Sequence, residues 1–241
     1  MRAETRHQLK QDRFSRVTID AAEATVHWTV EHKSKLVASA VVLLVIAGVL
    51  LGGWYYLNEQ DQKASVELSQ AVRTLDTPLR PAGAPADPEF PSYASSKERA
   101  TAAHQLFREI RDKYPHTRSS DFARYFLGLT ASQLSDNAAA ERELKQVASL
   151  HNPDLASLAK FALASIYRNT NRNKQAIDLY NQLIAKPSRT VAKNTAQLEL
   201  AATYQSANLP VEAKRMYEQV QKESPNSQAA QLASQRLQDL K

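Results

Sequence analysis

The residues of this 241-residue chain that could do chemistry are its histidines and carboxylates, but their spacing favours no site. No two histidines stand three or four positions apart and no His-Glu-x-x-His motif occurs, so local spacing predicts no metal site. The absence of cysteine excludes disulfides, thiolate metal ligands and a cysteine nucleophile. The six histidines are His7, His27, His32, His104, His116 and His151.

The carboxylates show no catalytic arrangement either. Glu141 and Glu143 stand two positions apart, which puts them on different faces of a helix, and we interpret them as solvated surface. Five glycines, three of them within one apolar stretch, argue against phosphate-binding loops and tight hairpins. The sequence therefore predicts no catalytic residue, no cofactor and no metal site, and we expect no enzyme.

One long apolar stretch dominates the N-terminal part of the chain. Residues 36–57 are 22 residues without a charge, and as a helix they extend about 33 Å, close to the roughly 30 Å of a bilayer core. Trp54, Tyr55 and Tyr56 stand at its far end, where interfacial aromatic residues are expected. We predict a transmembrane helix. A cleaved signal peptide is the alternative, disfavoured because about 35 residues precede the stretch.

The charges on either side of the stretch predict its orientation. Basic residues are more frequent in the preceding tail, residues 1–35, than in the first residues that follow the stretch. The positive-inside rule then places the tail in the cytoplasm and residues 58–241 across the membrane. Within the tail, Phe14, Val17, Ala21, Ala24 and Trp28 follow helical spacing, so the tail is either a surface helix or an extension of the anchor.

The prolines divide the rest of the chain. Five of the ten crowd into residues 78–91, which predicts an extended connector over residues 77–94. The segment before it, residues 58–76, continues the anchor as a juxtamembrane helix. Its apolar residues are expected to pack against a helix at 97–113; they are Val66, Ala71, Val72 and Leu75. The dipeptides Asn152-Pro153 and Ser224-Pro225 predict helix starts.

Residues 95–241 resemble tetratricopeptide repeats, with small and aromatic residues at the spacing of that 34-residue unit. Three units follow a half unit that contains Ala103, Phe107 and Ile110, and a C-terminal helix is expected to cap the array. The predicted fold is all-α: an N-terminal transmembrane helix followed by a helical-repeat solenoid. The motif positions are Leu127, Gly128, Ala131, Ala140, Leu144 and Val147 in the first unit, Leu163, Ala164, Tyr167, Ala176, Tyr180 and Leu183 in the second, and Leu200, Ala201, Tyr204, Ala213, Tyr217 and Val220 in the third.

The inner face of such a solenoid is built from the first helix of each unit, and apolar side chains there suit an extended or helical peptide. Phe122 and Phe161 are either open in this groove or covered by a neighbouring unit. The candidate peptide-binding residues are Phe122, Tyr125, Leu129, Leu158, Phe161, Arg168, Leu198 and Gln205. Whether the groove or the convex face binds is left open by the sequence.

A second candidate contact lies in the apolar stretch. Gly48 and Gly52 form a GxxxG pair, which lets another transmembrane helix approach closely, a homo-oligomer partner included, or else faces lipid. The net charge of +6 comes from interspersed acidic and basic residues without a basic stripe, so no nucleic-acid partner is predicted.

The residues around the anchor carry a resemblance to a known family. Trp28, Glu31-His32, Lys35-Leu36, Gly53-Trp54-Tyr55 and Ala64-Ser65 resemble the bacterial ancillary SecYEG translocon subunit (YfgM) family. The resemblance implies a single-pass inner-membrane protein with a periplasmic repeat domain that associates with translocon subunits, periplasmic chaperones or client polypeptides. The alternative is a tetratricopeptide scaffold for cell-envelope or outer-membrane protein assembly, or for division coordination. The missing lipobox cysteine favours the first.

Overall fold

The computed structural model describes residues 33–81, 83–85 and 91–240, and helices dominate this part of the chain. The predicted all-helical repeat fold is confirmed. Residues 57–240 belong to one compact unit, separate from the residues before them. The tail motif from Phe14 to Trp28 lies outside the described residues. The helices are α2 (Lys33–Asp76), α3 (Ser96–Lys113), α4 (Arg118–Gln133), α5 (Asn137–Ala148), α6 (Pro153–Asn169), α7 (Asn173–Ala185), α8 (Lys193–Ser206), α9 (Pro210–Glu223) and α10 (Gln228–Gln238).

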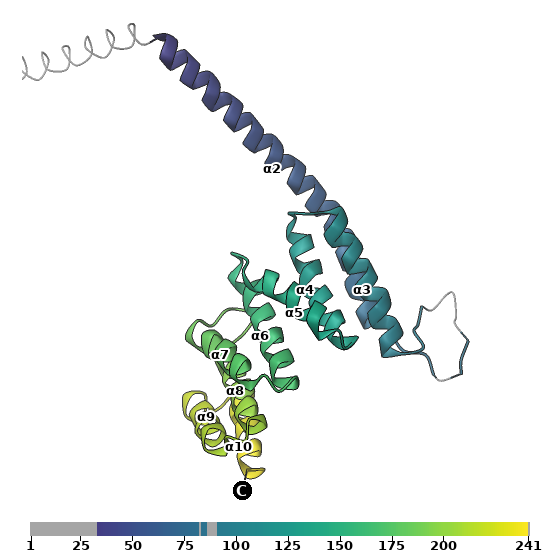
Figure 1. Cartoon of the computed structure of the whole chain (residues 1–241), viewed down its shortest axis with the longest axis vertical. Coiled ribbons are helices and arrows are strands. Elements are labelled where there is room, and N and C mark those ends of the chain that lie inside the picture. Colours follow the sequence, from purple (N-terminus) through teal and green to yellow (C-terminus); the bar gives the residue numbers. More distant parts are fainter. Residues whose placement is uncertain (1–32, 82, 86–90, 241) are drawn as a thin grey trace, which may run out of the picture. The chain divides into compact units, whose positions relative to one another are not determined.

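Successive helices from α3 to α10 pack against one another as antiparallel neighbours (Figure 1). The repeat units are α4–α5, α6–α7 and α8–α9. The first helices also contact each other, α4 with α6 and α6 with α8, whereas among the described elements the second helices contact only first helices and α10. The first helices α4, α6 and α8 therefore stand side by side and form one continuous face.

Each unit turns between its two helices in the same way. Ser135, Asn171 and Asn208 follow the three first helices and adopt the left-handed backbone, with φ of 65°, 58° and 58°. The next residue donates its backbone N–H to a carbonyl in the last turn of the helix, at 2.9, 2.8 and 2.9 Å in the three units. This hydrogen bond is the Schellman motif, which satisfies a free carbonyl and ends the helix sharply.

Of the two predicted helix starts, one is confirmed and the other is wrong. The Asn152 side chain caps α6, accepting from the backbone N–H groups of Asp154 and Leu155 at 3.1 and 3.2 Å. The prediction at Ser224 is wrong, because Ser224 ends α9 and Ser227 caps α10. Pro225 lies in the short turn between them, which leaves the capping role to the next hydroxyl along the chain.

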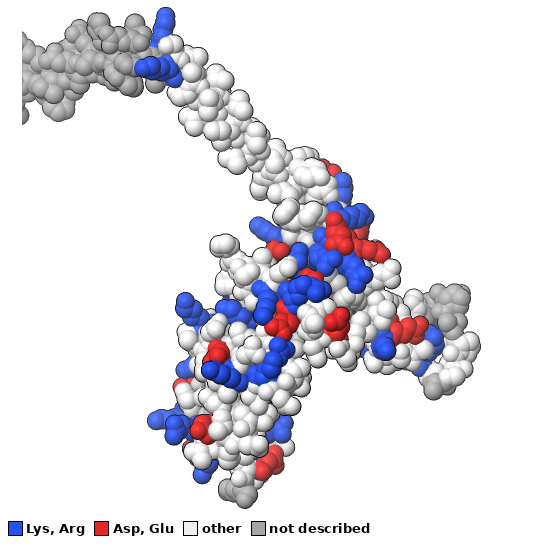
Figure 2. All heavy atoms as spheres, in the orientation of Figure 1, with Lys and Arg blue, Asp and Glu red and all other residues white. Residues whose placement is uncertain are grey.

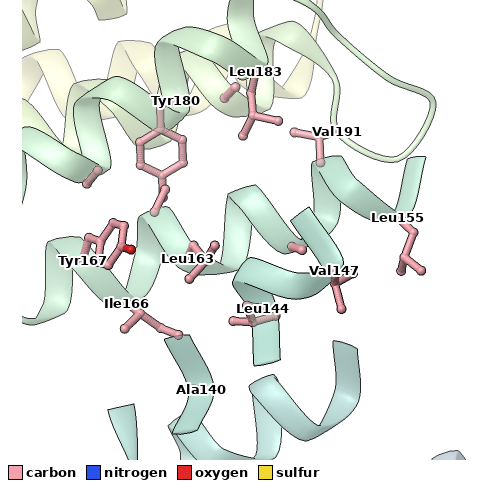
Figure 3. Close-up of a cluster of buried hydrophobic side chains, with 14 of the residues drawn as sticks. Ala140, Leu144, Val147, Leu155, Leu163, Ile166, Tyr167, Tyr180, Leu183 and Val191 are labelled. Carbon is pink, nitrogen blue, oxygen red and sulfur yellow. The ribbon is translucent and has the colours of Figure 1, made fainter. Parts of the chain in front are cut away.

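The motif positions form the core. In the two best-defined units, the small residues at the eighth position and the large residues at the twenty-fourth are fully buried: Ala164 and Ala201 with Tyr180 and Tyr217. Figure 3 shows the largest cluster, in which side chains of α5, α6 and α7 meet, with Tyr167 and Tyr180 among them. Smaller clusters join α2, α3 and α4 at one end of the array and α8, α9 and α10 at the other.

The first unit packs its two helices most tightly. Gly128 of α4 lies against Leu144 of α5, and a Cβ atom on Gly128 would stand 2.4 Å from the Leu144 Cγ. The units that carry alanine at this position have a flat tyrosine ring opposite in place of a branched leucine. The glycine therefore permits a close approach that no larger residue allows without movement.

The last third of α2 packs as the missing first helix of the half unit. Ala71, Val72 and Leu75 contact the cluster around Phe107, as expected. The prediction for Val66 is wrong, since its side chain is 59% exposed. The buried face follows positions 64, 68, 71 and 75, the 3.6-residue period, and position 66 lies on the opposite side of the helix.

Candidate functional site

The candidate site is the face formed by the first helices α4, α6 and α8. Among its eight predicted residues Phe122 is exposed and the other seven are half-buried. Each therefore combines a packed side with an accessible side. Three of these residues lie on α4, three on α6 and two on α8: Phe122, Tyr125 and Leu129, then Leu158, Phe161 and Arg168, then Leu198 and Gln205.

Each of the two alternatives for the phenylalanines, open in the groove or covered by a neighbour, applies to one of them. Phe122 keeps 38% of its surface exposed. Phe161 is partly covered: its ring stands edge-on to that of Tyr180, with ring centroids 5.7 Å apart, and it packs on the largest core cluster. Tyr125 contacts the same cluster, and burial raises the pKa of its phenol. Tyr125 and Phe161 are thus anchored in the core, whereas Phe122 is open to solvent.

The polar members of the face are held by neighbours. The Arg168 guanidinium donates to the Glu199 carboxylate at 2.5 Å, which ties α6 to α8. Gln205 accepts from the Tyr217 hydroxyl at 2.8 Å, which ties α8 to α9. These contacts fix the polar groups beside the apolar ones, so the face is preorganised for a ligand that offers both kinds of contact.

The interpretation of Glu141 and Glu143 as solvated surface is wrong. Glu143 is buried, and its carboxylate accepts from Arg111 of α3 at 3.1 Å and from Arg124 of α4 at 3.3 Å. The spacing of two positions does separate the carboxylates, but the neighbouring helices cover both faces. Glu143 therefore joins three helices, a role that only the tertiary packing reveals.

Glu141 makes the corresponding contacts toward the next unit. It accepts from the Tyr167 hydroxyl at 3.0 Å and from Arg172 at 2.6 Å, and it pairs with Lys145 at 2.7 Å. Hydrogen bonds from Lys145, Arg172 and Tyr167 lower the pKa of Glu141 to about 2, against the opposing effect of partial burial. Both carboxylates hold the array together rather than face solvent.

No chemistry emerges from the described histidines. His104 Nδ1 lies 2.9 Å from the Thr130 hydroxyl, and burial together with Arg108 and Arg111 lowers the His104 pKa. No group of three histidine, aspartate or glutamate side chains in the described ranges could hold a metal ion. His7, His27 and His32 lie outside those ranges.

The N-terminal part of α2 carries the predicted anchor. It is long and apolar enough to cross a membrane, by length and composition, and its side chains in the apolar stretch are exposed. Figure 2 shows basic residues at the start of this helix, followed by a long stretch without charged residues. A Cβ atom on Gly48 or Gly52 would meet nothing within 4 Å, so the surface at the glycine pair is open.

The comparisons with known proteins agree with this architecture. The model of a tetratricopeptide repeat-like domain family matches residues 27–182, more than half of the chain. The chain belongs to this family. A second model, of a tetratricopeptide repeat, matches residues 195–227, which contain most of α8 and all of α9. No curated protein matches the chain. Tetratricopeptide repeats mediate contacts between proteins, and tetratricopeptide domains are typically non-catalytic scaffolds.

The tetratricopeptide pattern predicts the core well and the polar contacts poorly. The small and aromatic positions can be found from spacing alone, because the same packing recurs in each unit. The contacts of Arg111, Arg124 and Arg172 with their carboxylates involve partners 19 to 32 positions away, and charge at those positions follows no repeat. The sequence contains one indication of these contacts, since Glu141 and Glu143 stand in the middle of a second helix whose other positions follow the packing pattern of the repeat.

Proposed function

We propose that this protein is a non-enzymatic, membrane-anchored interaction module that binds polypeptides on the face of α4, α6 and α8. The observation that supports the proposal is the half-buried row of Tyr125, Phe161 and Leu198, one from each unit at the same position of its first helix. Tyrosine is among the residues that most often contribute the largest share of the binding energy in protein interfaces.

The ligand that suits this face is an extended or helical segment of another protein. Successive units present an apolar side chain at a regular interval, which matches regularly spaced apolar side chains on the segment. Arg168 and Gln205 offer polar contacts at the margin, where they orient a ligand more than they hold it.

In the proposed topology residues 36–57 cross the bacterial inner membrane, residues 1–35 stay in the cytoplasm, and residues 58–241 lie in the periplasm. The proposed partner is the SecYEG translocon with the chaperones or clients near it. Support comes from the basic residues before the span and from the resemblance of the Gly53-Trp54-Tyr55 segment to that translocon-subunit family.

Affinity purification of the full chain in a mild detergent tests this proposal. We expect translocon subunits or envelope chaperones to be enriched over a control single-pass membrane protein. The double substitution Tyr125→Ala and Leu198→Ala should reduce that enrichment, whereas Val211→Ala, an exposed position on α9, should not.

Two outcomes would redirect the proposal. Enrichment of outer-membrane assembly or division proteins in place of the translocon would support the alternative scaffold role. Recovery that is unchanged by the double substitution, in a variant that still melts like the parent, would exclude the α4, α6 and α8 face as the binding surface.

A further inference from the structure

A surface cavity lies where α5, α6 and α7 meet, apart from the α4, α6 and α8 face. Its volume is about 470 Å³, and α6 contributes Pro153, Ala156, Ser157 and Lys160, one face of its first two turns. The groove residue Leu158 stands on a different face of the same helix, and Phe161, four positions after Ser157, stands at the border of the cavity face without lining it. A ligand in the cavity is therefore distinct from one that contacts Tyr125 and Leu198.

The walls of the cavity are apolar. Leu150 from the turn before α6 and Leu183 and Pro187 from the end of α7 line it together with Ala156. Three alanines of the lining, Ala148, Ala156 and Ala185, create the hollow, since larger side chains there would fill it. The space accommodates one branched or aromatic side chain with part of its backbone.

The polar side chains that line the cavity include two lysines and no carboxylate; they are His151, Ser157, Lys160, Gln182, Lys186 and Ser188. Lys160 and Lys186 belong to the lining, and neither forms an ion pair with a residue in the described ranges. The hydroxyl of Ser157 likewise has no hydrogen-bond partner among those residues. Most other described cations near this end of α6 and α7 are engaged; Arg189, for example, donates to Asp154 at 2.7 Å. No carboxylate lines the cavity, so its charge is positive.

We propose that this cavity, which we call the α5–α7 site, binds an acidic polypeptide segment that carries an apolar side chain. The apolar side chain enters the hollow between Ala156 and Leu183. A carboxylate beside it accepts from the Ser157 hydroxyl and pairs with Lys160 and Lys186. Charge complementarity selects the ligand: two free ammonium groups and a hydroxyl donor at the edge of an apolar pocket match an anion joined to an apolar group.

The experiment measures fluorescence anisotropy of a labelled peptide, in which glutamates flank a leucine, with the full chain in a non-ionic detergent. The peptide should bind, and a peptide with glutamines in place of glutamates should not. Lys160→Gln and Lys186→Gln should each weaken binding about threefold to fivefold, the range of a partly exposed ion pair. Lys174→Gln, an exposed lysine in the first turn of α7, is the matched control and should change nothing.

Charge reversal provides the stricter measurement. With Lys160→Glu and Lys186→Glu together, the acidic peptide should stop binding and a peptide with lysines around the leucine should bind instead. Equal binding of the acidic peptide to the parent and the reversed variant would overturn the proposal. The proposal would also be overturned if the reversed variant lost binding to vesicles rich in phosphatidylglycerol while its binding of the acidic peptide did not change. The site would then take a lipid headgroup. Substitutions at Tyr125 and Leu198 should leave this peptide unaffected, which separates a failure here from a failure of the groove.

Discussion

At the scale of single residues, two tyrosines at the same repeat position differ in whether the hydroxyl has a hydrogen-bond partner. Tyr180 and Tyr217 are both fully buried, in the second and third units. The Tyr217 hydroxyl donates to Gln205 at 2.8 Å, whereas the Tyr180 hydroxyl has no partner among the described residues. A buried hydroxyl without a partner costs free energy, and one with a partner contributes to stability.

Replacing each tyrosine with phenylalanine should therefore give different results. Tyr217→Phe loses a hydrogen bond and leaves Gln205 without its donor, so the free energy of unfolding should fall by about 1 kcal/mol. Tyr180→Phe removes an unsatisfied group and should leave stability unchanged or raise it slightly. Denaturant titration followed by circular dichroism measures both, and an equal loss in the two variants would contradict the assigned contacts.

The second residue-scale prediction concerns acid. Glu141 has a pKa lowered from 4.5 to about 2 by hydrogen bonds from Lys145, Arg172 and Tyr167. A depressed carboxyl pKa contributes stability that is complete above the unfolded pKa and is lost as pH falls toward the folded one. Its contribution should therefore disappear progressively between pH about 4.5 and about 2.

The variant Glu141→Gln isolates that contribution. At neutral pH it should be less stable than the parent, and the difference should shrink steadily as the pH is lowered through this window. Unfolding free energies from denaturant titration over the pH series check this. A difference that stays constant from neutral to acid pH would mean that Glu141 does not titrate with a lowered pKa. Glu109→Gln, an exposed glutamate of α3, is the control.

At the scale of helices, the approach of α4 to α5 depends on one glycine. An alanine Cβ at position 128 would stand 2.4 Å from the Leu144 Cγ, and Leu144 is itself fully buried. Gly128→Ala should therefore destabilise the domain by about 1–3 kcal/mol, the usual cost of overpacking, although alanine favours helix formation.

A second substitution tests the cause. Leu144→Ala removes the Cγ and both Cδ atoms that a Cβ at position 128 would meet, so Gly128→Ala should cost less stability in the Leu144→Ala background than in the parent. Thermal unfolding of the three variants gives the comparison. If Gly128→Ala proves more stable than the parent, helix propensity outweighs packing here and the close contact of α4 with α5 is not maintained.

Helix positions and their buried faces could be predicted from the sequence because local rules determine them. The alanines and tyrosines at repeat spacing, the Asn152 cap and the face of α2 at Ala71 and Leu75 all follow from periodicity. Val66 was assigned to the wrong face because a short apolar pattern does not define which of two neighbouring stripes meets a partner. The Ser224 assignment failed because a three-residue turn and a helix start use the same residue types.

The candidate site could be predicted only in part. Positions of the first helices identified a shared face, since the repeat places them side by side. The degree to which Phe161 is covered by Tyr180 depends on side-chain geometry between units. The α5–α7 site could not be predicted, because its walls come from three helices and its hollow from the smallness of Ala156, which in sequence looks like any other helix alanine.

At the scale of the whole molecule, the proposed topology places the two ends of the chain on opposite sides of the membrane. The absence of cysteine allows a clean labelling experiment, because any introduced cysteine is the single thiol of the protein. Lys174→Cys in the repeat domain should react with a membrane-impermeant maleimide in cells with a permeabilised outer membrane. Gln8→Cys in the tail should react only after the inner membrane is disrupted. The reverse pattern would contradict the orientation.

The central claim is that the face of α4, α6 and α8 receives another polypeptide. Site-specific photocrosslinking in intact membranes tests it most directly. A photoreactive phenylalanine analogue in place of Phe122 or Tyr125 should give crosslinked protein adducts. The same analogue at Val211 of α9 or Lys174 of α7, both exposed positions on second helices, should give none. Adducts from Val211 and Lys174 with none from Phe122 and Tyr125 would contradict the account and place the interaction on the second helices.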